Sequence, residues 1–276
     1  MTTVRAALAA AAADLRAGGV PDAARDARRL MAAALGLAPD RLTLHADDAL
    51  SPGAAAGFAR MVGERLLRRP VAQIIGRRSF CGLELAVDGR VLDPRPETET
   101  LVLAALDGPE PARILDLGTG SGAILLALLS GWPAARGLGT DIDDGALAVA
   151  RGNAERLGLA PRAAFVRGDW WQDVGGRFDL VVSNPPYVSE AEFAALDPDV
   201  RDWEPRHALT PGPSGLEAYR AIAAGLAARL APGGRALFEI GPTQAWAVAE
   251  LLDAAGFPGA RVHRDLDGRD RVVEVG

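Results

Sequence analysis

The apolar residues from position 96 onward switch repeatedly between the two-residue period of a β-strand and the longer period of an α-helix. This alternation constrains the fold most, because strands that alternate with helices form a doubly wound, Rossmann-like, mostly parallel sheet. The last two strands are joined by "DGR", so we expect an antiparallel final strand. Seven strands are predicted, at 112–118, 136–142, 162–169, 178–184, 235–241, 260–266 and 270–276, with helices at 121–131, 143–158, 215–234 and 243–257.

Residues 1–75 have only helical patterns. Gly- and Pro-rich breaks at 18–22, 36–40 and 50–53 predict four or five short helices. This part contains ten Arg and seven acidic residues, a net charge of +3. A solvated helix surface and a binding surface both fit that charge.

A change of pattern follows at 76–95. "FCGLELAV" alternates and precedes Asp88 and Gly89, and an Asp-Gly pair between short apolar runs predicts a β-hairpin. The predicted organisation is a helical substrate-recognition domain at 1–75, a β-hairpin linker at 76–95 and an α/β domain at 96–276.

The charge of the chain disfavours a nucleic-acid partner. The formal net charge is -6, and the residues after position 75 contain 20 Arg and 29 acidic residues, a net charge of -9. Non-specific nucleic-acid binding depends on basic side chains that contact phosphates. We therefore expect no direct nucleic-acid partner.

The single cysteine, Cys81, excludes an internal disulfide and a cysteine-based zinc site, as is typical of a reducing cytoplasm. The Ala-rich start contains Arg5, Asp14 and Arg16, which favours an amphipathic helix over a signal peptide. The chain has no run of about 20 uncharged apolar residues that would span a membrane. We expect a cytoplasmic protein with no membrane partner.

A glycine-rich loop, "DLGTGSG" at 116–122, follows the first strand of the predicted sheet. Ligands of open α/β sheets bind at the carboxyl ends of the strands, where glycines let the backbone approach a ligand. Asp141 ends the second strand and is placed to accept hydrogen bonds from ribose hydroxyls. The candidate binding residues are Gly118, Thr119, Gly120, Ser121, Gly122 and Asp141.

The loop alone leaves the ligand open. Gly118, Gly120 and Ala123 satisfy the loose dinucleotide pattern of NAD sites. Asp116 and the tight glycine spacing favour the S-adenosyl-L-methionine (SAM) site of class I methyltransferases. Asp116 also fits a structural role in capping the loop, and a ligand-free loop is a third interpretation.

The fourth strand of this domain ends on "SNPPY" at 183–187, where proline cannot continue a ladder. Proline fixes φ, so the carbonyls of Asn184 and Pro185 point in defined directions, and the Asn side chain adds a carbonyl acceptor. These acceptors can hold the N–H groups of a planar NH2 group and aim its nitrogen at a methyl donor. Pro186 completes the turn, and Tyr187 offers a flat face for a planar substrate.

This motif by itself also fits an ordinary turn, because Asn-Pro is a turn signal. Combined with the glycine loop and Asp141, it predicts a methyltransferase that acts on an amide or amino group. It also disfavours NAD, because hydride transfer does not use an amide clamp.

Further stretches complete a specific combination in order and spacing. They are "RPVAQIIGRRSFCGLEL" (69–85), "DPRPETE" (93–99), "GTDID" (139–143), "GDW" (168–170), "EPRHAL" (204–209), "FEIG" (238–241) and "DLDGRDRVV" (265–273). With the loop and "SNPPY", they resemble the PrmC/HemK family, the release factor glutamine methyltransferases, over nearly the whole chain. Members have a helical bundle, a β-hairpin and a class I SAM-dependent methyltransferase domain. They methylate the glutamine amide of the Gly-Gly-Gln (GGQ) motif in peptide chain release factors.

The resemblance implies that Gly118–Gly122 and Asp141 bind SAM, with Trp170 near the adenine. It implies that Asn184 contacts both cofactor and substrate, and that Asn184–Tyr187 hold the glutamine amide.

Two stretches depart from the family pattern. Asp93 stands where the family usually has an aliphatic residue, and "TPGPSGLEAY" at 210–219 replaces the usual continuation after "HAL". Arg95 and Glu99 fit structural pairs as well as site residues, and His207 is expected in a surface loop.

Two other functions remain as alternatives. An amino-methyltransferase that acts on nucleic acid would need a basic face and an additional recognition region. A SAM-binding or release-factor-binding module without activity would not need an intact Asn-Pro-Pro-Tyr. We further hypothesise that the helical residues 1–75 clamp a protein partner, because the pocket alone would contact only a short loop of it.

Overall fold

The computed structural model describes residues 2–276 and divides into two compact units. One unit contains the residues up to Arg77 together with Asp197–Trp203, and the other contains Arg78–Leu196 and Glu204–Gly276. Residues 197–203 therefore belong to the helical unit, although the chain before and after them belongs to the second unit. No helix within residues 2–276 is long and apolar enough to cross a membrane.

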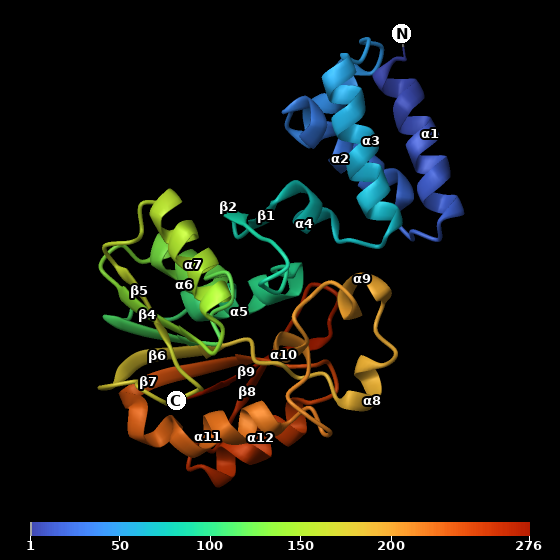
Figure 1. Cartoon of the computed structure of the whole chain (residues 1–276). Helices are drawn as coiled ribbons and strands as arrows, with labels where there is room; N and C mark the ends of the chain where they lie inside the picture. The colour runs from blue at the N-terminus through green and yellow to red at the C-terminus, as the bar shows by residue number, and fades with distance from the viewer. Residues whose placement is uncertain (1) are drawn as a thin grey trace. The chain divides into compact units, whose positions relative to one another are not determined.

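The second unit is built on a seven-stranded sheet in the order β5-β4-β3-β6-β7-β9-β8 (Figure 1). The first five strands of this order are parallel, and β9 pairs antiparallel with both β7 and β8. This arrangement confirms the predicted mostly parallel sheet and its antiparallel final strand. The strands are β3 (Arg113–Leu117), β4 (Arg136–Asp141), β5 (Ala163–Arg167), β6 (Phe178–Ser183), β7 (Leu230–Glu239), β8 (Arg261–Arg264) and β9 (Asp270–Val275).

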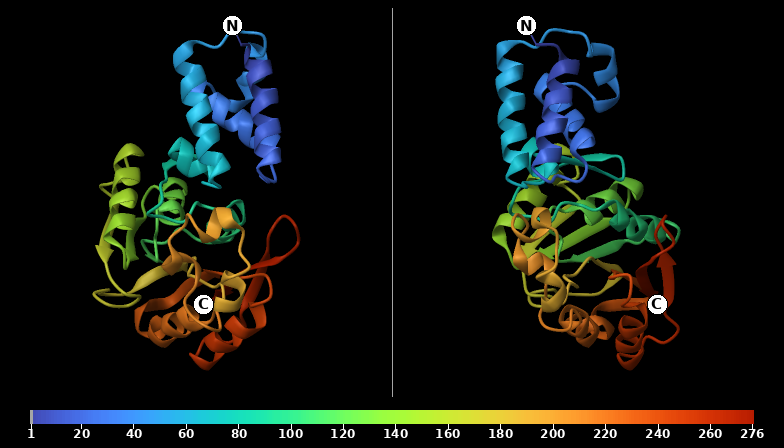
Figure 2. Two further views of the ribbon diagram at one scale, coloured as in Figure 1. Left: turned by 45° about the vertical axis from the view of Figure 1, so that its right-hand side comes forward. Right: turned by 90° about the vertical axis from the view of Figure 1, so that its right-hand side faces the viewer.

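Helices cover both faces of this sheet (Figures 1 and 2). Adjacent residues of β3 alternate between two buried clusters, with Ile114 in the cluster formed with α5, α6 and α7 and Leu115 in the cluster formed with α11 and α12. The sequence of a strand that is buried on both faces is typically a continuous apolar run, and "ILDL" at 114–117 is interrupted only by Asp116. The long helices are α5 (Glu99–Leu106), α6 (Ala123–Gly131), α7 (Asp144–Arg156), α11 (Glu217–Arg229) and α12 (Ala245–Ala254). Shorter helices are η2 (Pro96–Thr98), α8 (Glu190–Phe193) and α10 (Arg206–Leu209).

The strand order reverses between β3 and β6. After β3, the chain adds β4 and β5 on one side of the sheet and then crosses to add β6 on the other side. Such a topological switch point is where open α/β sheets bind ligands. Leu117 and Ser183, the last residues of β3 and β6, are partners in the parallel register. The glycine loop and the Asn-Pro-Pro-Tyr motif therefore begin side by side.

The linker contains the expected hairpin, but the predicted position of its turn was wrong. The hairpin pairs β1 (Arg77–Phe80) with β2 (Leu83–Ala86), so its turn is Cys81–Gly82. Both turn residues have positive φ, 46° and 77°, as a two-residue type I′ turn requires. Asp88 instead forms a separate local turn, because its carboxylate accepts the backbone N–H of Arg90 at 3.0 Å.

The helix predicted at 215–234 also ends earlier than expected. α11 ends at Arg229 because Leu230 already pairs with β6 as the first residue of β7. The register then shifts between Leu230 and Arg235, so that Pro232–Gly234 lie in a bulge of the strand and do not terminate the helix.

The first unit is a helical bundle, as expected. Its apolar core includes Leu15, Leu30 and Phe58 from three different helices. The helices of the N-terminal part are α1 (Val4–Ala17), α2 (Ala23–Leu35), η1 (Pro39–His45), α3 (Pro52–Leu66) and α4 (Val71–Ile75), and the short α9 (Pro198–Arg201) joins them.

A buried ion pair network holds α9 against this bundle. Arg65 of α3 donates from Nε to Asp26 at 2.7 Å and from Nη2 to Asp199 at 2.6 Å. The side chains of Arg65 and Asp26 are only 6% and 8% exposed. Removing one member of a buried charge network leaves the others unpaired, which costs far more than breaking a surface pair.

We expect Arg65→Met to destabilise the helical unit by about 3–5 kcal/mol, because two carboxylates lose their buried partner. The matched control is Arg60→Met, which breaks only the pair with Glu64 and removes a side chain that is 64% exposed. The control should cost less than about 1 kcal/mol. Native-state hydrogen exchange of amides in α2 and α3 measures both effects. Equal protection in the two variants would contradict the prediction.

Candidate active site

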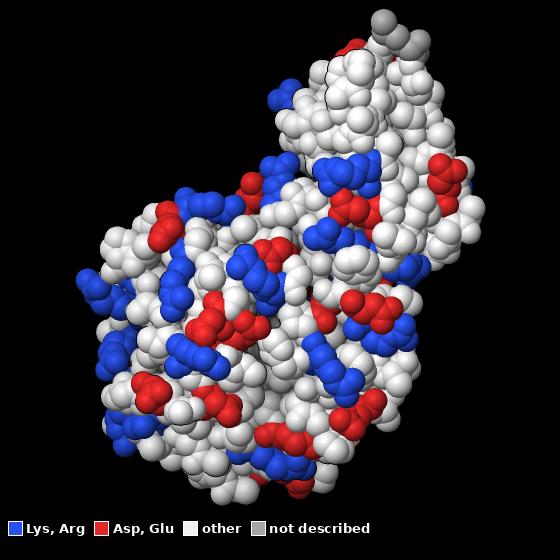
Figure 3. Space-filling view, in the orientation of Figure 1, with Lys and Arg blue, Asp and Glu red and all other residues white. Residues whose placement is uncertain are grey.

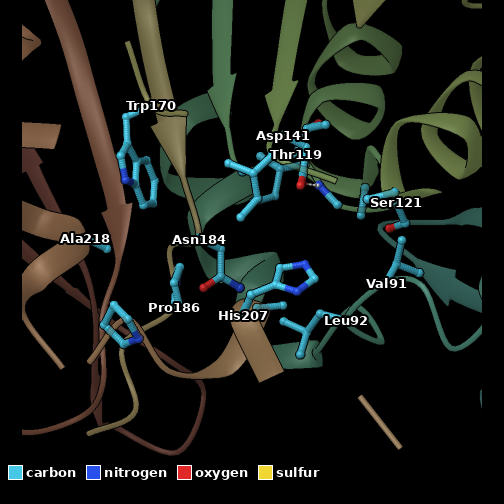
Figure 4. A pocket seen from close by; sticks show the side chains of 18 of the residues that line it. Val91, Leu92, Thr119, Ser121, Asp141, Trp170, Asn184, Pro186, His207 and Ala218 are labelled. Carbon is cyan, nitrogen blue, oxygen red and sulfur yellow. Dashed lines mark hydrogen bonds between the residues drawn. The ribbon is translucent and has the colours of Figure 1, made fainter. Parts of the chain in front are cut away.

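A cavity of about 310 Å³ lies at the carboxyl edge of the sheet in the second unit (Figure 4). Its walls include the segments that follow β3, β4, β5 and β6, which is the ligand position typical of this fold. The candidate residues in the lining are Gly118, Thr119, Gly120, Ser121, Asp141, Trp170, Asn184 and Pro186. Three further candidates, Gly122, Pro185 and Tyr187, adjoin these in sequence but are not in the lining that residues 2–276 provide.

The glycine loop is held by its own backbone and by two carboxylates. Gly118, Gly120 and Gly122 have φ values of 68°, 54° and 81°, a left-handed conformation that side chains disfavour. The N–H of Gly120 donates to Oδ2 of Asp141 at 2.9 Å. The hydroxyl of Thr119 donates to the carboxylate of Asp116, near the end of β3. The loop thus turns tightly, and at Gly118 and Gly120 no side chain stands between its backbone and the cavity.

Two aspartates have different roles at this loop. Asp116 is fully buried, accepts the Thr119 hydroxyl at 2.6 Å, and has its pKa raised to about 7 by burial. It is absent from the cavity lining of the described chain, which favours the structural role for Asp116. Asp141 lines the cavity, and its Oδ1 accepts the N–H of Asp143 at 3.0 Å. Burial also raises the pKa of Asp141. Each Asp141 oxygen has a second lone pair that remains for a ligand hydroxyl.

Trp170 also lines the cavity and lies to the left of Asp141 in the view of Figure 4. Its φ is 50°, a conformation that a bulky residue adopts only where the surroundings impose it. The indole lies partly against the buried cluster beneath α11 and α12 and partly against the cavity. It offers a flat apolar surface to a planar ligand.

The Asn-Pro-Pro-Tyr segment begins where β6 ends. The Ser183 hydroxyl donates to the carbonyl of Leu117 at 2.7 Å, which ties the ends of β6 and β3 together. Asn184 points to the cavity, and its Nδ2 donates to Oγ1 of Thr98 at 3.3 Å. The carbonyl of Tyr187 accepts from Nε2 of Gln244 at 3.0 Å, and burial raises the pKa of the Tyr187 phenol above its usual range.

Several cavity residues were missed by the sequence reasoning. His207 was expected in a surface loop, but it lines the cavity, with its Nε2 3.8 Å from Oδ2 of Asp143. Thr98 and the stretch Arg90–Leu92 also line it. Although Thr98 and His207 stand in the quoted stretches "DPRPETE" and "EPRHAL", the sequence did not single them out, because these segments reach the sheet edge only through the tertiary fold.

Arg95 and Glu99 are held by partners of their own. Nη2 of Arg95 donates to both carboxylate oxygens of Glu204, at 2.8 and 2.7 Å. Burial raises the pKa of Glu204 to about 7 despite this partner. Oε1 of Glu99 accepts the N–H of Cys81 at 2.9 Å. Within residues 2–276, no group of three His, Cys, Asp or Glu side chains could hold a metal ion.

Comparison with known proteins identifies both parts of the chain. The description "PrmC N-terminal domain" matches residues 6–76, and "Methyltransferase small domain" matches residues 96–197. The chain is 54% identical to a release factor glutamine methyltransferase of Cereibacter sphaeroides over 98% of this chain and 96% of that protein. It is 47% identical to a release factor glutamine methyltransferase of Rhodospirillum rubrum over 94% of this chain and 80% of that protein.

Solved structures agree on the fold. A methyltransferase from Pyrococcus furiosus has a TM-score of 0.53 at 17% identity and covers 70% of this chain and 88% of its own. A ribosomal protein L11 methylase from Lactobacillus delbrueckii has a TM-score of 0.52 at 22% identity, with 69% of this chain and 83% of its own covered. At these identities, the likeness concerns the class I methyltransferase fold alone.

Gly122→Ala should destabilise the second unit more than Gly118→Ala. Both glycines have positive φ, but an added Cβ at Gly122 would lie 3.3 Å from the Cβ of Ala150 and 3.1 Å from Leu126, whereas at Gly118 it would meet open space. We expect a loss of about 1 kcal/mol at Gly118 from backbone strain alone and about 2–4 kcal/mol at Gly122, where crowding adds to it. Denaturant unfolding of the two variants measures the difference, and an equal loss would contradict it.

Proposed function

Because this chain belongs to the release factor glutamine methyltransferase family, we propose that it transfers a methyl group from S-adenosyl-L-methionine to the GGQ glutamine of peptide chain release factors. The methyl acceptor is the side-chain amide nitrogen of that glutamine. The observation that carries this proposal is the adjacency of two motifs in one cavity. The glycine loop follows β3 and Asn184 follows β6, and the last residues of these strands are register partners.

The residues at the cavity fit the cofactor. Gly118 and Gly120 present backbone without side chains, Asp141 has free lone pairs for ribose hydroxyls, and Trp170 offers a flat face for adenine. When bound, SAM supplies an electrophilic methyl group on a sulfonium sulfur. Asn184 lines the same cavity as the loop, and we assign it contacts with both cofactor and substrate.

The acceptor side of the site is suited to an amide. An amide nitrogen is a poor nucleophile because its lone pair is delocalised. The Oδ1 of Asn184 and the backbone carbonyls of Asn184 and Pro185 would accept its two N–H groups, and Pro185 and Pro186 hold this backbone rigid. Tyr187 would pack its ring against the amide plane. Hydrogen bonds to these acceptors stabilise the positive charge that develops as the nitrogen attacks. The proton then leaves to bulk water.

We also infer that the helical unit helps to select the release factor. Residues 1–75 have a net charge of +3, and Asp197–Trp203, which belong to the same unit, contribute one Arg and three Asp, a net charge of -2. The face of the second unit visible in Figure 3 has acidic and basic side chains interspersed. This distribution favours a protein partner over a nucleic acid, which would require a continuous basic surface.

The proposal is tested by mass spectrometry of an unmethylated release factor after incubation with this protein and SAM. We expect a single added methyl group on the GGQ glutamine, and none when that glutamine is replaced by alanine. Asn184→Ala should lower kcat about 100-fold or more, by analogy with the loss of one transition-state hydrogen-bonding group. Calorimetry should show that the same variant still binds SAM.

Two outcomes would contradict this assignment. Full activity of Asn184→Ala would exclude the amide clamp. Binding of SAM without methylation of any release factor would leave the fold and the cofactor standing and would favour a nucleic-acid amino group as the acceptor.

The recognition role predicts a charge effect confined to the helical unit. Arg25→Glu combined with Arg60→Glu, at side chains 76% and 64% exposed, should raise KM for the release factor at least about threefold at low salt. The matched control reverses Arg167 and Arg264 of the second unit, which are 69% and 71% exposed. SAM affinity should stay constant in both. An equal rise of KM in the two variants would show that the net charge of the whole protein, and not the surface of the helical unit, determines KM for the release factor.

A further inference from the structure

A chain of buried polar side chains connects the interior of the second unit to Asn184. Nδ2 of Asn184 donates to Oγ1 of Thr98 at 3.3 Å, and the Thr98 hydroxyl also lies close enough to the Glu239 carboxyl group to lower its pKa. Thr98 lies in η2 and is 3% exposed, and Glu239 ends β7 and is 1% exposed. Water therefore has little access to the two groups behind Asn184.

We propose that Glu239 and Thr98 are positioning residues that determine which end of the Asn184 amide faces the substrate. This inference rests on the proposed function, because it concerns how Asn184 receives the N–H groups of the glutamine amide. It assigns a role to a buried carboxyl group that does not itself touch the reacting atoms.

The donor and acceptor of each contact between Glu239, Thr98 and Asn184 follow from which of these groups carries a proton. An ionised Glu239 carboxylate can only accept hydrogen bonds, so the single hydroxyl proton of Thr98 is directed to it. Oγ1 of Thr98 can then only accept from Asn184, which draws the NH2 end of the Asn184 amide toward Thr98. The carbonyl end, Oδ1, is left facing the cavity.

This orientation decides whether the clamp works. The two ends of an asparagine amide have nearly the same shape, so packing does not distinguish them, and only hydrogen bonding does. Oδ1 toward the cavity accepts an N–H of the substrate amide. The flipped side chain would present a donor to a donor and would leave the substrate nitrogen without its acceptor.

The surroundings of Glu239 make its charge sensitive to pH. Burial raises the pKa of Glu239 to about 7, with Glu97 raising it and Arg271 and the hydroxyl of Tyr187 lowering it. Arg271 is itself shared with Asp265, 3.4 Å from Nη2, and Tyr219 donates its hydroxyl to the main-chain carbonyl of Glu239. Oε2 of Glu239 has no hydrogen-bond partner within residues 2–276. Lowering the pH through about 7 therefore protonates Glu239, which frees the Thr98 proton and removes the constraint on Asn184.

The first test compares Thr98→Val with Thr98→Ser. Valine keeps the shape and removes the hydroxyl, so kcat should fall about 10- to 30-fold, the loss expected for about 1.4–2 kcal/mol of transition-state stabilisation. KM for the release factor and Kd for SAM should change less than threefold. Serine keeps the hydroxyl and should restore kcat to within threefold of the unaltered chain. Thr43→Val, at a threonine of the helical unit that accepts from Arg28, controls for loss of a hydroxyl elsewhere.

The second test uses pH and does not depend on Thr98 variants folding. For the unaltered chain, kcat should fall as the pH drops through about 7, because protonation of Glu239 releases Asn184. Glu239→Gln cannot ionise, so its kcat should be lower at pH 8 and should lack this acid limb. Equal loss in Thr98→Val and Thr98→Ser, or an acid limb that persists in Glu239→Gln, would overturn the proposal.

A spectroscopic readout separates this inference from the proposed function. The side-chain NH2 resonances of Asn184, identified by their loss in Asn184→Ala, should shift between pH 8 and pH 6 in the full chain without substrate. They should not shift in Glu239→Gln. An invariant spectrum in the unaltered chain overturns the positioning role, even if methylation of the release factor is observed. A pH-dependent shift supports it, even if the acceptor proves to be a different amide or amino group.

Discussion

The parallel pairing of β3 with β6 is the constraint on which the rest of the site depends. It sets Leu117 beside Ser183, and the Ser183 hydroxyl closes the pair by donating to the Leu117 carbonyl at 2.7 Å. The residues that follow these positions are the glycine loop and Asn184. A slip of one residue in this register would turn every side chain of one strand to the other face of the sheet. The two buried clusters, one on each face, therefore hold the register that brings the two motifs together.

Buried carboxyl groups support the site, but their burial lowers the stability of the fold at neutral pH. Burial raises the pKa of Asp116, Glu204 and Glu239 to about 7, from the ordinary values of 3.8 for Asp and 4.5 for Glu. Each group binds its proton more tightly in the folded chain than in the unfolded chain, so stability decreases as the pH rises from about 4 to about 7. Each carboxyl has a specific partner close to the cavity wall. Asp116 accepts from Thr119 of the loop and Glu204 accepts from Arg95. Glu239 lies beside Thr98, whose hydroxyl lowers the pKa of this carboxyl group.

The loop after Tyr187 serves both units. Asp197–Trp203 pack with the helices through Arg65, and the chain then returns to form α10, where His207 lines the cavity. A single connection thus follows the Asn-Pro-Pro-Tyr segment and includes part of the helical unit and a wall of the cavity. A partner that binds the helical unit, as we propose, would therefore contact residues that are close in the chain to the Asn-Pro-Pro-Tyr segment.

The sequence alone determined the class of fold and the two motifs, because strand and helix periods, glycine spacing and proline positions are local properties of the backbone. It predicted the seven strands and singled out Asp141 and Asn184, the family resemblance added Trp170, and the tertiary fold gathers all three in one cavity. Only the tertiary structure decided the hairpin turn at Cys81, because the alternative turn at Asp88 is satisfied by its own side chain. It also decided the places of Thr98 and His207, since the stretches that contain them, "DPRPETE" and "EPRHAL", do not show which of their side chains reach the cavity. These side chains meet Asn184 or the cavity across long separations in sequence, and packing on the carboxyl edge of the sheet brings them there.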